Sequence, residues 1–170
     1  MKNNLRAATL AATAMLVLGF QAGAAGAAPV TATAQAKAKV LKQISVSKSA
    51  DLNFGTVVVS NTAGTVVIDA DGVRNCGSGL TCSGATAAGA FTIAGTKNEN
   101  VTISASPSVQ LTSAEDSSVK MTATLALSTA ALKLSNGGAG VFNVGGTLAV
   151  GASQADGLYE GSFNVTVDYQ

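Results

Sequence analysis

The sequence contains no histidine and no tryptophan, and it has only two tyrosines and five phenylalanines. Histidine is the side chain that most often acts as a general base, so its absence removes the usual route to acid–base and nucleophilic catalysis. The chain also lacks the glycine-rich phosphate and dinucleotide motifs and the G-x-S-x-G turn that presents a catalytic serine. We therefore expect a protein that is not an enzyme and that holds no cofactor.

Charged residues are scarce as well, at 11% of the 170 residues, so serine, threonine, asparagine and glycine must cover most of the surface. Such a surface is typical of extracellular β-proteins and unlike that of a cytosolic enzyme. The 19 glycines and the short alternating runs of valine and threonine favour an all-β fold. The formal net charge is only +1, which gives no electrostatic reason to expect nucleic acid or an anionic lipid surface as a partner.

Two groups of acidic residues resemble parts of known sites. Asp69 and Asp71 precede Gly72 as in the first part of a calcium loop, but the further ligands and the closing glutamate are missing. Glu115 and Asp116 are adjacent in a serine-rich stretch, where a solvated turn is a simpler interpretation than an acid–base pair. We interpret both groups as turns, and we expect no metal site.

The first 27 residues have the pattern of a cleaved, bacterial-type export signal. Lys2 and Arg6 form a basic start, residues 7–20 are apolar, and the small residues 25–27 offer a site for signal peptidase. The apolar run is shorter than the roughly 20 residues that a membrane-spanning helix needs. We expect cleavage after residue 27, export to the periplasm, the cell surface or the medium, and no membrane span.

Cys76 and Cys82 are the only cysteines. In an exported protein, two cysteines so close in sequence are expected to form a disulfide. Their spacing is not C-x-x-C, and no histidine is present to complete a zinc site, so a redox or metal role is disfavoured. Closing so short a loop should contribute about 2 kcal/mol to stability.

The rest of the sequence reads as short strands separated by turns rich in glycine and asparagine. Residues 56–59 and 65–68 are rich in valine, and the Asn-Thr-Ala-Gly turn between them predicts that they pair as a hairpin. Gly145 and Gly146 interrupt a later run, where we expect a bulge or a bend. Strands at this spacing predict an immunoglobulin-like two-sheet β-sandwich over residues 41–170, with no second domain.

Residues 28–40 form a separate segment between the signal and the first core strand. Polar residues alternate in it with small or apolar ones, which are Val30, Ala32, Ala34, Ala36, Ala38 and Val40. This period of two predicts an extended arm that could add to the sheet of another subunit. A flexible tail is equally compatible with such small side chains, and alanine, lysine and glutamine also favour a helix.

The last fourteen residues carry the clearest pattern in the chain. Every second residue is apolar or small, namely Gly157, Tyr159, Gly161, Phe163, Val165, Val167 and Tyr169. The residues between them are polar from Glu160 on, so the pattern predicts a strand with one buried and one solvated face. Burial of its large apolar side chains should contribute about 1.5–3 kcal/mol each. One interpretation is a terminal core strand and nothing more.

This ending also resembles that of chaperone–usher pilus subunits, which finish in an alternating strand with a glycine fourteen residues from the terminus and a penultimate tyrosine. Gly157 and Tyr169 occupy these two positions. The resemblance implies a subunit that lacks its last immunoglobulin strand. A periplasmic chaperone lends a strand alongside the terminal one, and the N-terminal arm of the next subunit later replaces it. Residues 30–40 would then be the donor arm, and the alternating residues of 157–169 would be the acceptor.

Most of the chain after the signal is similar to the domain-of-unknown-function 4402 family of small exported bacterial proteins. The matching features are Leu52-x-Phe54-Gly55 near the start and the alternating ending from Gly157 to Tyr169. That resemblance implies no particular activity and is compatible with a pilus-like role.

These features lead to one expected function and one alternative. The expected function is a structural fimbrial or surface-fibre subunit that assembles by β-strand complementation with neighbouring copies of itself, helped by a periplasmic chaperone. The alternative is a monomeric secreted or envelope-associated β-sandwich that binds a ligand and does not polymerise. A terminal strand without a neighbour on its outer edge would favour the first function.

Overall fold

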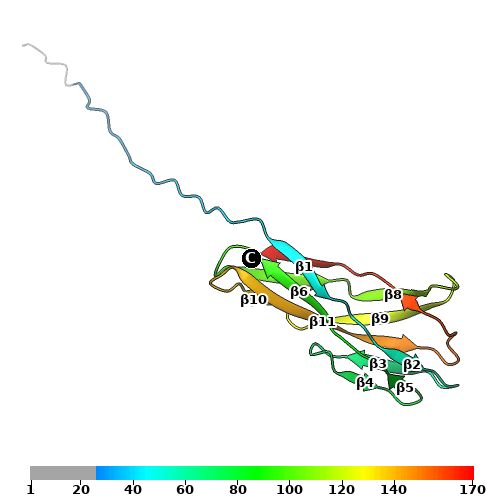
Figure 1. Ribbon diagram of the computed structural model, residues 1–170. Helices are drawn as coiled ribbons and strands as arrows, with labels where there is room; N and C mark the ends of the chain where they lie inside the picture. The colour runs from blue at the N-terminus through cyan, green and yellow to red at the C-terminus, as the bar shows by residue number, and fades with distance from the viewer. Residues whose placement is uncertain (1–25) are drawn as a thin grey trace, which may run out of the picture. The chain divides into compact units, whose positions relative to one another are not determined.

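The structure is a computed structural model that describes residues 26–170 (Figure 1). The expected export signal lies almost wholly outside the described residues and stays a prediction. The chain divides into a segment that ends at Ala38 and a compact unit from Lys39 to Gln170. Every regular element within residues 26–170 is a β-strand, which confirms the all-β prediction. No helix of this part of the chain is long and apolar enough to cross a membrane.

Residues 26–38 form neither a helix nor a strand, and their side chains are exposed. The helical alternative for the arm is therefore wrong in this structure, despite the favourable propensity of alanine and lysine. Isolated short helices are marginal in water, and this segment has no bulky apolar face that could stabilise one by packing. The alternation in the arm does not by itself produce a strand, because a strand needs a neighbour for its backbone groups.

A large antiparallel sheet forms one layer of the compact unit. Its main order is β1-β6-β11-β9-β8-β12. The bounds of these strands are Ser45–Ala50 for β1, Gly89–Ala94 for β6, Ala139–Val150 for β11, Lys120–Leu127 for β9, Ser108–Ser113 for β8 and Tyr159–Glu160 for β12. Two further strands, β3 (Gly64–Ile68) and β4 (Arg74–Cys76), extend this sheet beside the second half of β11.

The smaller sheet faces the large one and has the order β10-β7-β13, with β10 at Ala131–Lys133, β7 at Asn100–Ala105 and β13 at Val165–Tyr169. Side chains from both layers interdigitate in one apolar cluster, which contains Phe91, Ile93, Phe142 and Val144 from the large sheet and Val101, Ile103 and Val167 from the small one. Phe91 stacks on Phe142 with ring centroids 5.2 Å apart. This packing of two faces confirms the predicted β-sandwich.

A second cluster lies further along β11 and includes Phe54, Val66, Ile68, Leu148 and Val150. A two-stranded sheet of β2 (Thr56–Val58) and β5 (Thr81–Ser83) borders it. Figure 1 shows β2, β3, β4 and β5 grouped away from the C-terminus.

The predicted hairpin between residues 56–59 and 65–68 is wrong. β2 pairs with β5, whereas β3 pairs with β11 and β4. Val66 and Ile68 of β3 are almost completely buried. The edge of the long strand β11 offers them a core and a five-residue ladder, which a three-residue β2 does not.

Of the bulge or bend expected at Gly145 and Gly146, the bulge is absent, because the register of β11 against β9 runs through both residues without a shift. The glycines serve a different purpose. Here β11 exchanges its neighbour β6 for β3, and a Cβ atom at Gly145 would collide with the carbonyl oxygen of Ile68. A close approach of two backbones, and not an irregular strand, explains the pair.

Candidate functional site

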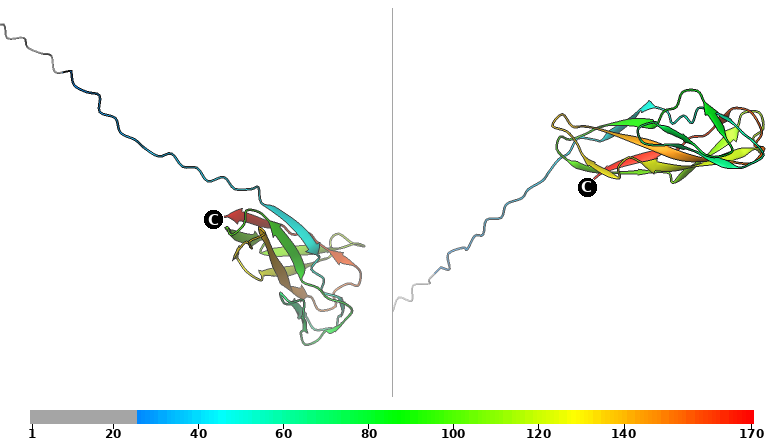
Figure 2. Two further views of the ribbon diagram at one scale, coloured as in Figure 1. Left: turned by 60° about the vertical axis from the view of Figure 1, so that its left-hand side comes forward. Right: turned by 90° about the horizontal axis from the view of Figure 1, so that it is seen from below.

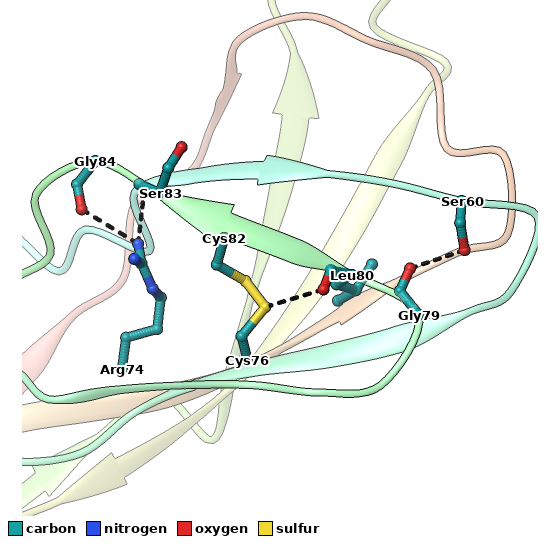
Figure 3. The surroundings of a disulfide bond; sticks show 8 residues. All are labelled: Ser60, Arg74, Cys76, Gly79, Leu80, Cys82, Ser83 and Gly84. Atoms are coloured by element: carbon teal, nitrogen blue, oxygen red, sulfur yellow. Dashed lines mark hydrogen bonds between the residues drawn. A yellow bond between two sulfur atoms is a disulfide. The ribbon is translucent and has the colours of Figure 1, made fainter.

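The two cysteines form the expected disulfide, with an S–S distance of 1.97 Å (Figure 3). It connects β4 to β5 and thereby ties the small β2–β5 sheet to the large one. Beside it, the guanidinium group of Arg74 donates to the carbonyl oxygen of Ser83 over 2.6 Å. These contacts give the disulfide a structural position at the border of the second cluster.

The acidic groups singled out in the sequence form hydrogen-bonded turns. A carboxylate oxygen of Asp69 accepts the N–H groups of Asp71 and Val73 over 2.9 and 2.8 Å. The Asp116 carboxylate accepts the hydroxyl and the N–H group of Ser118, and these bonds lower the pKa of Asp116. Within residues 26–170, no group of three histidine, cysteine or acidic side chains is placed to hold a metal ion.

The C-terminal ribbon, residues 157–170, is not one continuous strand. β12 adds to β8 and β13 adds to β7, and an irregular stretch of residues 161–164 joins them. Gly161 lies against β8, where a Cβ atom would collide with the carbonyl oxygen of Gln110. The ribbon therefore remains an edge throughout, passing from the large sheet to the small one.

The side chains of the ribbon alternate largely as the sequence predicts. Tyr159, Phe163, Val165 and Tyr169 are half-buried, Val167 is buried, and the even-numbered residues from 158 to 170 are exposed. Gly157 and Gly161 are exposed. Phe163 contacts both apolar clusters and meets Phe91 edge to face, with ring centroids 6.2 Å apart. The inward side chains thus pack on the core and yet keep part of their surface in solvent.

The backbone of β13 has one bonded and one open side. At its ends, Gln170 donates its N–H to the carbonyl of Asn100 over 3.1 Å, and Asn164 accepts the N–H of Ser106 over 3.0 Å. Bonded residues alternate with residues whose peptide groups point the other way in an antiparallel pair. The residues that direct N–H and C=O groups outward are Val165, Val167 and Tyr169. No strand within residues 26–170 pairs with that side.

β13 ends the small sheet, and β1 ends the large sheet on the side of the same apolar cluster. The left view of Figure 2 shows β1 in cyan next to β13 in red. Ile44 and Val46 from one strand and Phe163 and Val165 from the other are partly buried against the same cluster. We call this gap between the two sheet edges the open seam. Along the open seam, partly exposed apolar side chains lie next to backbone N–H and C=O groups that have no strand partner within residues 26–170.

Tyr169 closes one end of the open seam. Its hydroxyl group accepts the N–H of Thr96 over 2.7 Å and donates to the carbonyl oxygen of Lys42 over 2.8 Å. The penultimate tyrosine therefore joins the end of the ribbon to the residues that precede β1.

We expect Tyr169→Phe to lower the free energy of unfolding by about 1–2 kcal/mol, because it leaves one N–H and one C=O group without partners. Tyr159→Phe is the matched control. The Tyr159 hydroxyl donates to Ala155 over 2.7 Å and accepts from the Gln154 side chain over 2.9 Å, but both partners belong to the loop just before it, so its loss should cost less. Urea unfolding of both variants checks this, and equal losses would contradict the role assigned to Tyr169.

An apolar pocket with a volume of about 610 Å³ lies at the other end of the ribbon. Residues 52–59 form one wall, residues 154–159 form the other, and Leu111, Met121 and Leu148 contribute to the lining between them. We call this the end pocket. The sequence did not predict this pocket. The valines of residues 56–59 predict a strand, but they do not indicate that one side of the strand borders an empty space.

The predicted donor residues lie in the N-terminal segment and the short irregular stretch after it. Residues 26–44 contain no strand, and the exposed fractions of Val30 and Val40 are 99% and 90%. Both valines therefore present their side chains to solvent, as does each alanine of the alternating set.

A model of the family described as Domain of unknown function (DUF4402) matches residues 44–169. The match spans nearly all of the compact unit and includes both the early Leu52-x-Phe54-Gly55 element and the C-terminal ribbon. Neither the curated proteins nor the solved structures contain a match to this chain.

Proposed function

The chain belongs to the DUF4402 family, and we propose that it is a structural surface or fimbrial-type subunit that assembles by β-strand complementation. The C-terminal ribbon is the acceptor, and the N-terminal arm of a neighbouring copy is the donor. One observation carries this proposal. Val165 and Tyr169 of β13 combine a half-exposed inward side chain with peptide groups directed at a side that has no strand neighbour in the described chain.

An added strand would gain from both properties at once. Each outward-facing residue of β13 can exchange two hydrogen bonds with an antiparallel neighbour, which gives about six bonds over Val165, Val167 and Tyr169. Each such bond contributes roughly 0.5–1.5 kcal/mol net. The same strand would cover the apolar surface of Phe163 and Val165 along the open seam. An uncovered edge of this kind otherwise invites uncontrolled association.

The arm has matching length and pattern. Val30–Val40 and Tyr159–Tyr169 each span eleven residues with a period of two, so an extended arm can follow the whole ribbon. Its inward side chains are small, which suits a seam already occupied by the large side chains of Phe163 and Tyr169. Lys37 and Lys39 stand at polar positions of the arm and can stay in solvent.

The proposal includes export, an immunoglobulin-like sandwich type and a role without catalysis. The disulfide between Cys76 and Cys82 supports export, because such bonds persist mainly in oxidising compartments. Until a neighbouring copy arrives, the seam needs protection, which gives a periplasmic chaperone a reason to bind it.

The edge can be tested with a proline that removes an outward N–H group of β13 and keeps an apolar side chain at that position. We expect Val165→Pro to abolish binding of an arm peptide (residues 28–41) while the protein stays folded, since proline is tolerated in an edge strand when its N side faces solvent. Thr166→Pro is the matched control, because the N–H of Thr166 lies on the β7 side. It should lower the melting temperature by several degrees. Fluorescence anisotropy and thermal melting report the two effects.

Retention of full peptide binding by Val165→Pro would remove the edge from the mechanism. The alternative function, a monomeric binding protein of the envelope, has one observation in its favour, the end pocket of about 610 Å³. Pockets of 300–1,000 Å³ commonly hold small molecules. A chain that stays monomeric at high concentration and ignores the arm peptide would favour this alternative.

A further inference from the structure

The end pocket adjoins the C-terminal ribbon, but the assembly proposed above leaves this apolar space unfilled. Leu52, Val57, Leu111 and Met121 pack against the second cluster but remain only partly buried, because they border this space. Apolar side chains that leave surface exposed around a defined volume mark a site that an apolar group can occupy.

The site adjoins free backbone groups, which points to an extended peptide as the occupant. Tyr159 lines the pocket and is also the first residue of β12. Leu158 accepts the N–H of Ala114 over 2.8 Å, so the residue after it turns its own N–H and C=O away from β8. A segment that pairs with Tyr159 would therefore carry a side chain over the pocket. A free small molecule would leave those peptide groups unpaired.

The inward side chains of the arm are too small to fill that space. Its inward positions offer only the methyl groups of four alanines and the isopropyl groups of Val30 and Val40. Such side chains would leave most of the 610 Å³ empty, and unfilled apolar volume lowers stability in proportion to its size. The pocket lining also includes Asp156 and no lysine or arginine, so a cationic residue near the bulky one is favoured by charge.

We propose that the end pocket receives one large apolar side chain, a leucine, isoleucine, methionine or phenylalanine, from an extended segment of a different protein that pairs with the edge of β12. This inference rests on the proposed function, because it uses the same open ribbon. It adds the chemistry of a partner that a second copy of this chain cannot supply.

A peptide series tests the inference across the possible registers of a bound strand. Labelled arm peptides (residues 28–41) carry leucine in place of Ala32, Ala34, Ala36 or Ala38, one at a time, and are titrated into the full chain. We expect one of the four to bind about ten- to fifty-fold more tightly than the unsubstituted arm, from burial of three additional carbon atoms. Peptides with leucine at the polar positions Thr33 and Gln35 are the controls and should bind like the unsubstituted arm.

A protein variant then assigns the gain to the pocket. Val57→Phe adds bulk inside the recess, so the advantage of the best leucine peptide should fall to within about two-fold, while the unsubstituted arm binds as before. If the melting curve shows that Val57→Phe does not fold, Val59→Phe is used as the pocket-filling variant in its place.

The outcomes separate the two proposals. Binding of the unsubstituted arm without any gain from leucine, or an equal gain from the control peptides, overturns the inference and leaves strand complementation in place. Binding of a leucine peptide alone supports the inference and removes the second copy as donor. If no peptide binds, both the further inference and the proposed strand complementation are contradicted.

Discussion

Deletion of residues 28–39 is expected to leave a folded domain that no longer assembles. The deleted residues contribute no strand and no member of either apolar cluster. The deletion removes the ion pair between Lys39 and Glu99, whose charged atoms lie 2.7 Å apart. The lysine side chain is 68% exposed, and such pairs contribute less than about 1 kcal/mol. The melting temperature should therefore stay within a few degrees, while light scattering and electron microscopy should show no polymer.

A matched control separates the sequence of the arm from its length. Replacement of residues 28–38 by a glycine–serine segment of equal length keeps a tether but removes the alternating small side chains. We expect this variant to fail in assembly like the deletion. If either variant instead unfolds, the arm is an integral strand of its own domain and the alternative function gains. If the glycine–serine variant still polymerises, backbone pairing alone is sufficient and the alternation of the arm has no role.

The inward and outward positions of the C-terminal ribbon could be predicted almost residue by residue. Successive side chains of a strand point to opposite faces, so a periodic sequence determines which residues meet the core. Val165, Val167 and Tyr169 turned inward for this reason. The alternation gives no such information at Gly161, because glycine has no side chain that could face the core or the solvent. From this residue on, the ribbon leaves the large sheet and continues to the small one.

The partners of the strands could not be predicted in the same way. Alternation is a local property, whereas pairing depends on which distant edge is free when the chain collapses. A turn-like stretch suggested that residues 56–59 meet residues 65–68, but β11 offers the latter a longer ladder and a deeper core. The disulfide was predictable, because two cysteines so close in a chain with an export signal are expected to pair, and the glycine-rich residues between them allow the chain to turn.

The candidate site was predictable only in its acceptor half. The alternating pattern of residues 157–169 predicted a strand that could serve as a sheet edge. The structure adds that β13 ends the small sheet and that β1 ends the large sheet. The end pocket left no trace in the sequence. Leu52 and Met121 are far apart in the chain, and both look like ordinary core residues, so only their packing shows that a space remains between the elements that carry them.

Gly145→Ala is expected to lower the free energy of unfolding by about 3 kcal/mol, within the range observed when a well-packed interior is given an additional group. The new methyl group would point at the carbonyl oxygen of Ile68 and lie 2.9 Å from the carbonyl carbon of Asp69, and both are backbone atoms. β3 could relieve the clash only by moving away from β11. That movement would disturb the ladder that positions Val66 and Ile68 in the second cluster, which borders the end pocket.

Gly137→Ala is the matched control, because it makes the same chemical change where only the Ser135 hydroxyl oxygen, at 3.7 Å, lies near the new Cβ atom. It should leave stability within about 0.5 kcal/mol or raise it slightly, by restricting the unfolded chain. Hydrogen exchange gives the sharper readout. In Gly145→Ala the amides of β3 should lose protection while those of β7 and β13 keep theirs, because the open seam belongs to the other cluster. Uniform loss of protection would show that the two clusters unfold as one unit, and the pocket could then not be altered independently of the seam.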